Sequence, residues 1–157
     1  MFELQHVESG PALDEVRSLF VEYGQSLNFN LCFQSFDEEL RGLPGPYAPP
    51  AGRLILAWAG GKAAGCIAMK PLAPGICEMK RLYVRPEFRG HQLGTTLITR
   101  LIDDARSAGY TAMRLDTIAG AMDHAIALYR SLGFTDIPPY YPNPVTNALY
   151  FELLLQL

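Results

Sequence analysis

The sequence lacks the features of several large classes of protein. No apolar run approaches the roughly 20 residues that a membrane-spanning helix needs. The first six residues carry neither a basic segment nor an apolar one, so we expect no secretory signal. These absences favour a cytoplasmic protein with no membrane partner.

Cysteine is scarce, and histidine is equally so. Cys32, Cys66 and Cys77 are scattered, without the C-x-x-C spacing or the nearby pair of histidines that zinc sites use. We therefore expect reduced cysteines that pack as small apolar side chains, and no metal. A nucleophilic Cys77 is the alternative.

Charge is also sparse and unevenly placed. Charged residues make up 18% of the chain, and the net charge of −3 argues against nucleic acid as the main partner. Residues 78–91 nevertheless hold four basic residues against two acidic ones. Both an anion-binding site and a solvated charged loop fit this patch.

What is present suits one domain spanning residues 1–157, since this length can bury a core without disulfide or metal. Alternating apolar residues predict strands at 2–7, 53–59, 63–72, 76–84, 112–116, 134–137 and 148–155. Helical spacing predicts helices at 13–23, 93–105 and 122–129. Residues 24–52 are broken by proline, glycine and asparagine, which leaves room for one short helix near 36–40.

The order of these elements predicts an α/β fold. Gly60-Gly61 and Pro74-Gly75 are tight-turn pairs between strands, which indicates an antiparallel meander. The strand-helix-strand-helix order that follows indicates that the sheet is partly parallel.

The segment with the clearest chemistry runs from a strand through a turn into a helix. The first amides of a helix have no internal partner and carry the positive end of its dipole, so they bind anions where small residues allow approach. Gly90 and Gly94 are such residues, Arg89 adds charge, and Thr95 adds a hydroxyl donor. The sequence contains neither a P-loop nor a dinucleotide-binding G-x-G-x-x-G motif.

This turn resembles the pyrophosphate loop of the GNAT superfamily of acyl-CoA-dependent N-acyltransferases, which reads [QR]-x-x-G-x-[GA]. A second segment, residues 125–134, resembles the family's A-x-x-L-Y and L-G-F elements. The resemblance covers the chain from about Leu54 onward. It implies a mixed sheet of six or seven strands with helices on both faces. It also implies acetyl-CoA as acyl donor, bound by Leu82, Tyr83, Val84, Arg89, Gly90, His91, Gln92, Leu93, Gly94 and Thr95.

Two positions depart from the family pattern. Gln92 stands where the family usually has glycine, which puts a larger side chain beside the cofactor but keeps the backbone amide. Met122 replaces an asparagine often found ahead of the second signature, which removes one polar contact to the pantetheine arm.

The resemblance also implies catalytic roles. An alkylammonium is only about one part in a thousand neutral at pH 7, so amine attack on a thioester benefits from a proton acceptor. Glu78 matches the family's glutamate base, acting directly or through water, and Tyr129 matches its frequent general acid. Without the resemblance, Glu78 reads as a surface glutamate paired with Lys80 or Arg81, and Tyr129 as packing.

Further basic residues, Lys80, Arg81, Arg85 and Arg130, either assist the phosphates or are solvated. The resemblance implies that residues 24–50 and 139–147 bound the acceptor. The substrate candidates in these segments are Gln34, Tyr47, Tyr140 and Tyr141, beside Phe33 and Asn143. The sequence predicts acetyl transfer to a primary amine, with a homodimer possible. A silent CoA-binding regulatory module and an anion-binding interaction domain are the alternatives.

Overall fold

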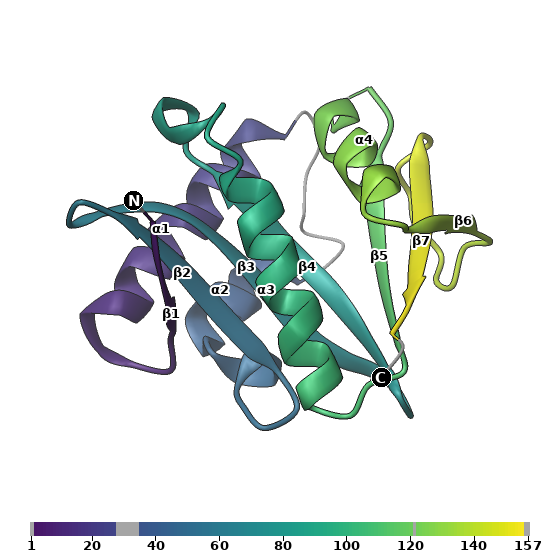
Figure 1. The fold of residues 1–157 in the computed structure, drawn as a ribbon, viewed down its shortest axis with the longest axis horizontal. Helices are drawn as coiled ribbons and strands as arrows, with labels where there is room; N and C mark the ends of the chain where they lie inside the picture. The colour runs from purple at the N-terminus through teal and green to yellow at the C-terminus, as the bar shows by residue number, and fades with distance from the viewer. Residues whose placement is uncertain (1, 28–34, 121, 156–157) are drawn as a thin grey trace.

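The computed structural model describes residues 2–27, 35–120 and 122–155 (Figure 1). Within them one sheet has the strand order β1-β2-β3-β4-β5-β7-β6. The strands are β1 (Glu3–His6), β2 (Arg53–Ala59), β3 (Lys62–Ala73), β4 (Ile76–Val84), β5 (Ala112–Ile118), β6 (Thr135–Ile137) and β7 (Ala148–Leu154). The helices are α1 (Gly10–Ser26), α2 (Phe36–Gly42), η2 (Gly45–Tyr47), η3 (Pro86–Phe88), α3 (Leu93–Ser107) and α4 (Asp123–Ser131). None of these helices combines the length and the apolar character needed to cross a membrane.

The predicted mixed sheet with helices on both faces is confirmed. Strands β2 and β4 have the predicted bounds, and the ends of the other predicted elements differ by up to three residues. Helix α1 begins at Gly10, three residues before the first apolar residue of its helical spacing, because Pro11 fits the first turn, where its missing N–H costs nothing. The short 3-10 helices η2 and η3 were not predicted.

Each face of the sheet has its own hydrophobic core. Helices α3 and α4 pack on one face with Ile55 and Ala57 of β2. Helix α1 covers the other face with Leu54 and Leu56. Successive residues of β2 are therefore buried on opposite faces, which explains why the strand is apolar throughout.

Strands β4 and β5 separate partway along their length, as Figure 1 shows. Their parallel pairing joins only Ile76–Glu78 to residues 112–114, although both strands continue beyond it. Strand β5 remains paired with β7 along its whole length. A gap therefore opens in the sheet after Glu78.

A bulge lies in β4 directly beyond this point. Cys66 of β3 pairs with Tyr83, whereas Ala68 pairs with Lys80, so β4 has one more residue than β3 between these pairs. Arg81, inside the bulge, has a φ of +61°. Bulges bend and twist the strand that contains them, so this one redirects β4 beside the gap.

Helix α3 begins immediately after a second residue of positive φ. Gln92 is the residue that precedes the helix, with a φ of 61° and a ψ of 23°, and its side chain caps no backbone amide. Its carbonyl accepts a hydrogen bond from the amide of Thr96 at 3.0 Å. The conformation explains why glycine suits this position, because only glycine adopts it without strain.

We predict that Gln92→Gly stabilises the protein. Removing the strained side chain should raise the free energy of unfolding by about 1 kcal/mol and Tm by roughly 2–4 °C. The same exchange at Gln25, which is exposed in α1, should lower Tm because glycine is a poor helix former. Thermal unfolding of both variants checks this, and a fall in Tm for Gln92→Gly would contradict it.

Candidate active site

A cavity of about 910 Å³ occupies the gap between β4 and β5. Leu93, Leu115 and Tyr129 line it on the face of α3 and α4, while Tyr23 and Lys80 line it on the face of α1. Because its lining comes from both faces, the cavity passes through the sheet.

The cavity wall at the start of α3 has the features expected of an anion site. Gln92, Leu93, Gly94 and Thr95 line it, and no side chain caps the first turn of the helix. Gly90 has a φ of +86°, and a Cβ there would meet no atom within 4 Å, so backbone conformation alone requires glycine. Gly94 serves packing, since a Cβ there would lie 3.3 Å from Leu128 of α4.

The structure brings nine of the ten predicted cofactor residues to this cavity. The lining includes Leu82, Tyr83, Val84, Arg89, Gly90, Gln92, Leu93, Gly94 and Thr95. His91 is the exception, because its ring lies against Phe2, with the centroids 6.5 Å apart. Its side chain therefore turns toward β1, and His91 contributes at most its backbone to the turn.

The basic patch divides into paired and cavity-lining residues. Arg85 and Arg130 form ion pairs with Glu22 at 2.7 Å and Asp136 at 3.4 Å. Arg89 donates from Nε to the carbonyl of Val84 at 2.9 Å and lines the cavity. Arg89 is thus the arginine best placed to meet an anion at the α3 turn.

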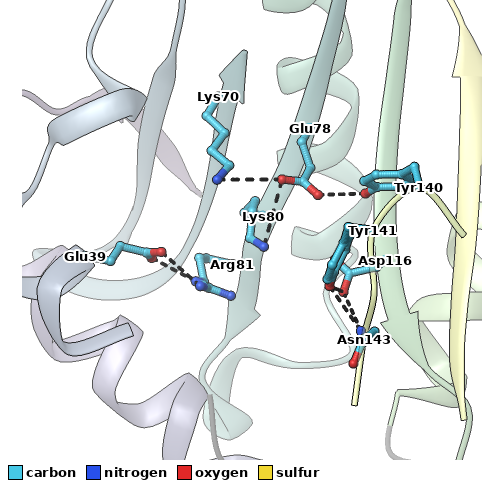
Figure 2. Close-up of polar contacts among 9 residues, drawn as sticks. All are labelled: Glu39, Lys70, Glu78, Lys80, Arg81, Asp116, Tyr140, Tyr141 and Asn143. Carbon is cyan, nitrogen blue, oxygen red and sulfur yellow. Dashed lines mark hydrogen bonds and ion pairs between the residues drawn. The ribbon is translucent and has the colours of Figure 1, made fainter. Parts of the chain in front are cut away.

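Glu78 is buried at the point where β4 and β5 separate, with 4% of its surface exposed (Figure 2). Tyr140 donates from its hydroxyl to Oε2 of Glu78 at 2.7 Å. The ammonium groups of Lys70 and Lys80 lie 3.9 and 4.0 Å from Oε1. Glu78 is therefore not a surface residue, and its neighbours Met79 and Lys80 line the cavity in its place.

The pKa values of two groups around Glu78 are shifted, mainly because these groups are buried. Burial lowers the pKa of the Lys80 ammonium. Burial, together with the adjacent Glu78 carboxylate, raises the pKa of the Tyr140 phenol. Tyr140 therefore stays protonated at neutral pH and remains a donor to Glu78.

Tyr129 lines the cavity from α4, on the face opposite Lys80. Its ring packs against Phe134 and Phe151, with centroids 5.8 and 6.4 Å apart. Burial raises the pKa of its phenol. The phenol therefore stays protonated at neutral pH, and its hydroxyl makes no hydrogen bond to the residues that the structure describes.

Asp116 is a cavity residue that the sequence analysis missed. It lies two residues before the end of β5, and its carboxylate accepts hydrogen bonds from Tyr141 and, at 3.4 Å, from the amide of Asn143 (Figure 2). The carboxylate and burial raise the pKa of Tyr141, with burial the larger cause. The available signal was a lone acidic residue near the C-terminal end of an apolar strand.

The loop after β6 thus supplies two neighbouring tyrosines, one to each side of the gap. Tyr140 contacts Glu78 of β4 and Tyr141 contacts Asp116 of β5. Their rings and that of Tyr150 pack edge to face, with centroids 5.2–5.6 Å apart. Both predicted tyrosines therefore lie beside the gap.

The other two substrate candidates fare differently. Tyr47 is 1% exposed in the core under α1, where its ring packs against Phe20 at 6.2 Å. It does not line the cavity, because η2 turns its side chain inward, and we withdraw it as a substrate contact. Gln34 and Phe33 lie outside the described residues, as does Cys32.

Cys66 and Cys77 are free and buried, and burial raises the pKa of both thiols, that of Cys77 to about 12. Neither is therefore a thiolate at neutral pH. Among the described residues, no group of histidine, cysteine or acidic side chains is arranged to hold a metal ion.

Comparisons with known proteins agree with this geometry. A model of the Acetyltransferase (GNAT) family matches residues 13–134. An uncharacterized N-acetyltransferase of Schizosaccharomyces pombe is 43% identical over 143 residues, which cover 90% of this chain and 87% of that protein.

Solved structures share the fold. An acetyltransferase of the GNAT family from Staphylococcus aureus Mu50 has a TM-score of 0.79 at 17% identity, covering 98% of this chain and all of that one. The PaiA N-acetyltransferase of Thermoplasma acidophilum, solved in complex with coenzyme A, has a TM-score of 0.75 at 16% identity, covering 98% and 99%. The protein is therefore a member of the GNAT family of acyl-CoA-dependent N-acetyltransferases.

Proposed function

We propose that the protein transfers an acetyl group from acetyl-CoA to a primary amine of a small molecule or peptide by direct attack of the amine. The observation that carries this proposal is the cavity through the β4–β5 gap. It has the uncapped first turn of α3 on one side and Asp116 of β5 in its lining, and Glu78 lies buried where β4 and β5 separate. Acetyl-CoA would supply the acetyl group as a thioester, whose carbonyl carbon the neutral amine can attack directly.

The cofactor end is built mainly from backbone. The amides of Leu93, Gly94 and Thr95 would hold the pyrophosphate at the positive end of α3, with Arg89 adding charge. The backbone of Leu82 and Val84 would pair with the pantetheine arm like an added strand. The gap supports this pairing, because β5 leaves that edge of β4 after Glu78.

The transfer requires two proton movements. The amine nitrogen forms a bond to the acetyl carbon and loses a proton, which Glu78 accepts directly or through water. The bond from carbon to sulfur breaks, and the hydroxyl of Tyr129 protonates the sulfur. The place of Tyr129 in the cavity lining supports this role. Burial raises the pKa of its phenol, so the proton to be donated is present at neutral pH.

The acceptor would arrive on the face of α1, beside Asp116, Tyr140 and Tyr141. Two carboxylates flank this part of the gap, and each already accepts hydrogen bonds from a tyrosine. Outside residues 78–91 the chain has 9 basic and 14 acidic residues, and this balance of −5 weakly favours a cationic amine over an acidic acceptor.

The first test is release of free thiol from acetyl-CoA in the presence of amines, amino acids, polyamines and peptides. We expect binding of coenzyme A and thiol release that requires one class of amine. Tight binding without acceptor-dependent release would instead support a silent regulatory module. Failure to bind coenzyme A would refute the proposal.

We predict that Glu78→Gln lowers kcat/KM by about 10²-fold, because the amide cannot accept the proton. The amide oxygen can still accept the Tyr140 hydrogen bond, so the loop should keep its place. The remaining rate should rise with pH as more of the amine becomes neutral.

The matched control for this variant is Glu152→Gln. Glu152 pairs with Arg114 at 2.8 Å on the same face of the sheet, away from the cavity lining. Its turnover should match that of the unaltered protein. Unchanged turnover and pH profile in Glu78→Gln would exclude Glu78 as the base.

We predict that Tyr129→Phe lowers kcat by at least about tenfold, within the range for loss of a general acid, and leaves Tm nearly unchanged. Tm should hold because the lost hydroxyl has no hydrogen bond among the described residues. The control, Tyr110→Phe, removes a 2.7 Å bond to the carbonyl of Ala51 far from the gap, so it should lower Tm and keep turnover. Equal turnover in both variants would argue against the acid role.

A further inference from the structure

A buried ion pair connects helix α2 to the bulge of β4 (Figure 2). Arg81 donates from Nε and Nη2 to the two carboxylate oxygens of Glu39, each at 2.9 Å. The side chain of Arg81 is 2% exposed, and the rings of Tyr23 and Phe36 lie 5.8 and 5.1 Å from its guanidinium carbon. Two parallel hydrogen bonds and two rings fix both the position and the plane of the guanidinium.

The backbone of Arg81 is strained, and it lies between Glu78 and Leu82. Arg81 has a φ of +61°, which a residue with a side chain rarely adopts unless its surroundings impose it. It lies three residues after Glu78, and Leu82 and Val84 are the first and third residues after it. The bulge therefore joins the proposed base to the strand edge proposed for the pantetheine arm.

Stability alone does not account for a buried pair of this kind. Replacing a buried ion pair with apolar residues of similar volume is often neutral or stabilising, whereas an ion pair specifies one geometry. Burial, and secondly the nearby Glu39 carboxylate, raise the pKa of the Tyr47 phenol, so Glu39 also lies close to the core residue Tyr47. The ion pair thus ties the bulge to the core under α1.

We propose that Glu39 is a positioning residue for the cofactor, which acts through Arg81 to hold the β4 bulge and so directs the backbone of Leu82 and Val84 into the cavity. This inference rests on the proposed function, in which that backbone pairs with the pantetheine arm. It also gives Arg81 a role different from the phosphate contact considered from sequence. Glu39 belongs to residues 24–50, the segment expected to bound the acceptor. The ion pair with Arg81 therefore connects that segment to the proposed cofactor strand β4.

The test compares two ligands that differ in the pantetheine arm. Coenzyme A has the arm, and adenosine 3′,5′-bisphosphate has only part of the phosphate end. In Glu39→Gln, which loses a charged hydrogen-bond partner, calorimetry should show coenzyme A affinity reduced about tenfold. Affinity for the bisphosphate should change less than about twofold, because α3 and Arg89 are untouched.

Two further variants separate positioning from stability. Glu38→Gln alters an exposed neighbour on α2 and should change neither affinity. The double variant Glu39→Leu with Arg81→Met replaces the whole pair with apolar side chains, so it should fold, keep its Tm, and still lose coenzyme A affinity selectively.

The outcomes distinguish this inference from the proposed function. If the unaltered protein binds coenzyme A no more tightly than the bisphosphate, the proposed pantetheine site is wrong. If it binds coenzyme A more tightly, but the ratio of the two affinities stays the same in Glu39→Gln and in the double variant, the positioning role is wrong. An equal loss of affinity for both ligands would overturn the positioning role in the same way, since it indicates a general loss of structure.

Discussion

The site depends on the separation of β4 and β5 after Glu78. Each strand is held by its other neighbour, since β4 pairs with β3 up to Val84 and β5 pairs with β7 up to Ile118. These pairings keep β4 and β5 apart beyond Glu78, so the gap is a fixed property of the sheet. Backbone groups along such a gap lose their usual ladder partners, and buried groups of this kind require others. An extended ligand with amide groups of its own can provide those partners.

The distribution of charge follows from the same gap. Carboxylates at its edges would be costly to bury alone, and each has neighbours that reduce the cost: Lys70, Lys80 and Tyr140 for Glu78, and Tyr141 with Asn143 for Asp116. On the opposite face, the α3 turn presents amides and Arg89 with no acidic residue in the first helical turn. The cavity is therefore polarised, with donors for an anion on one side and acceptors for an amine on the other.

Sequence patterns predicted the structural features that depend on residues close together in the chain. Apolar alternation located β4, and the glycine spacing located the α3 turn, because both signals lie within a few residues. The same reasoning missed the burial of Tyr47, the outward turn of His91 and the place of Asp116 in the cavity. It also missed the Glu39–Arg81 pair, whose members are 42 positions apart in the chain. Each of these depends on which strands and helices come together, which no local period encodes.

This division also explains why the donor was predictable and the acceptor was not. The proposed cofactor end would use backbone amides and a strand edge, and the helix turn appears in the sequence as glycines at fixed spacing. The proposed acceptor end would use side chains from β3, β4, β5 and the loop after β6, which only the fold brings together. A side-chain exchange there changes which amine fits and leaves the α3 turn intact. Acceptor specificity can therefore vary among proteins with this fold while the acyl donor stays the same.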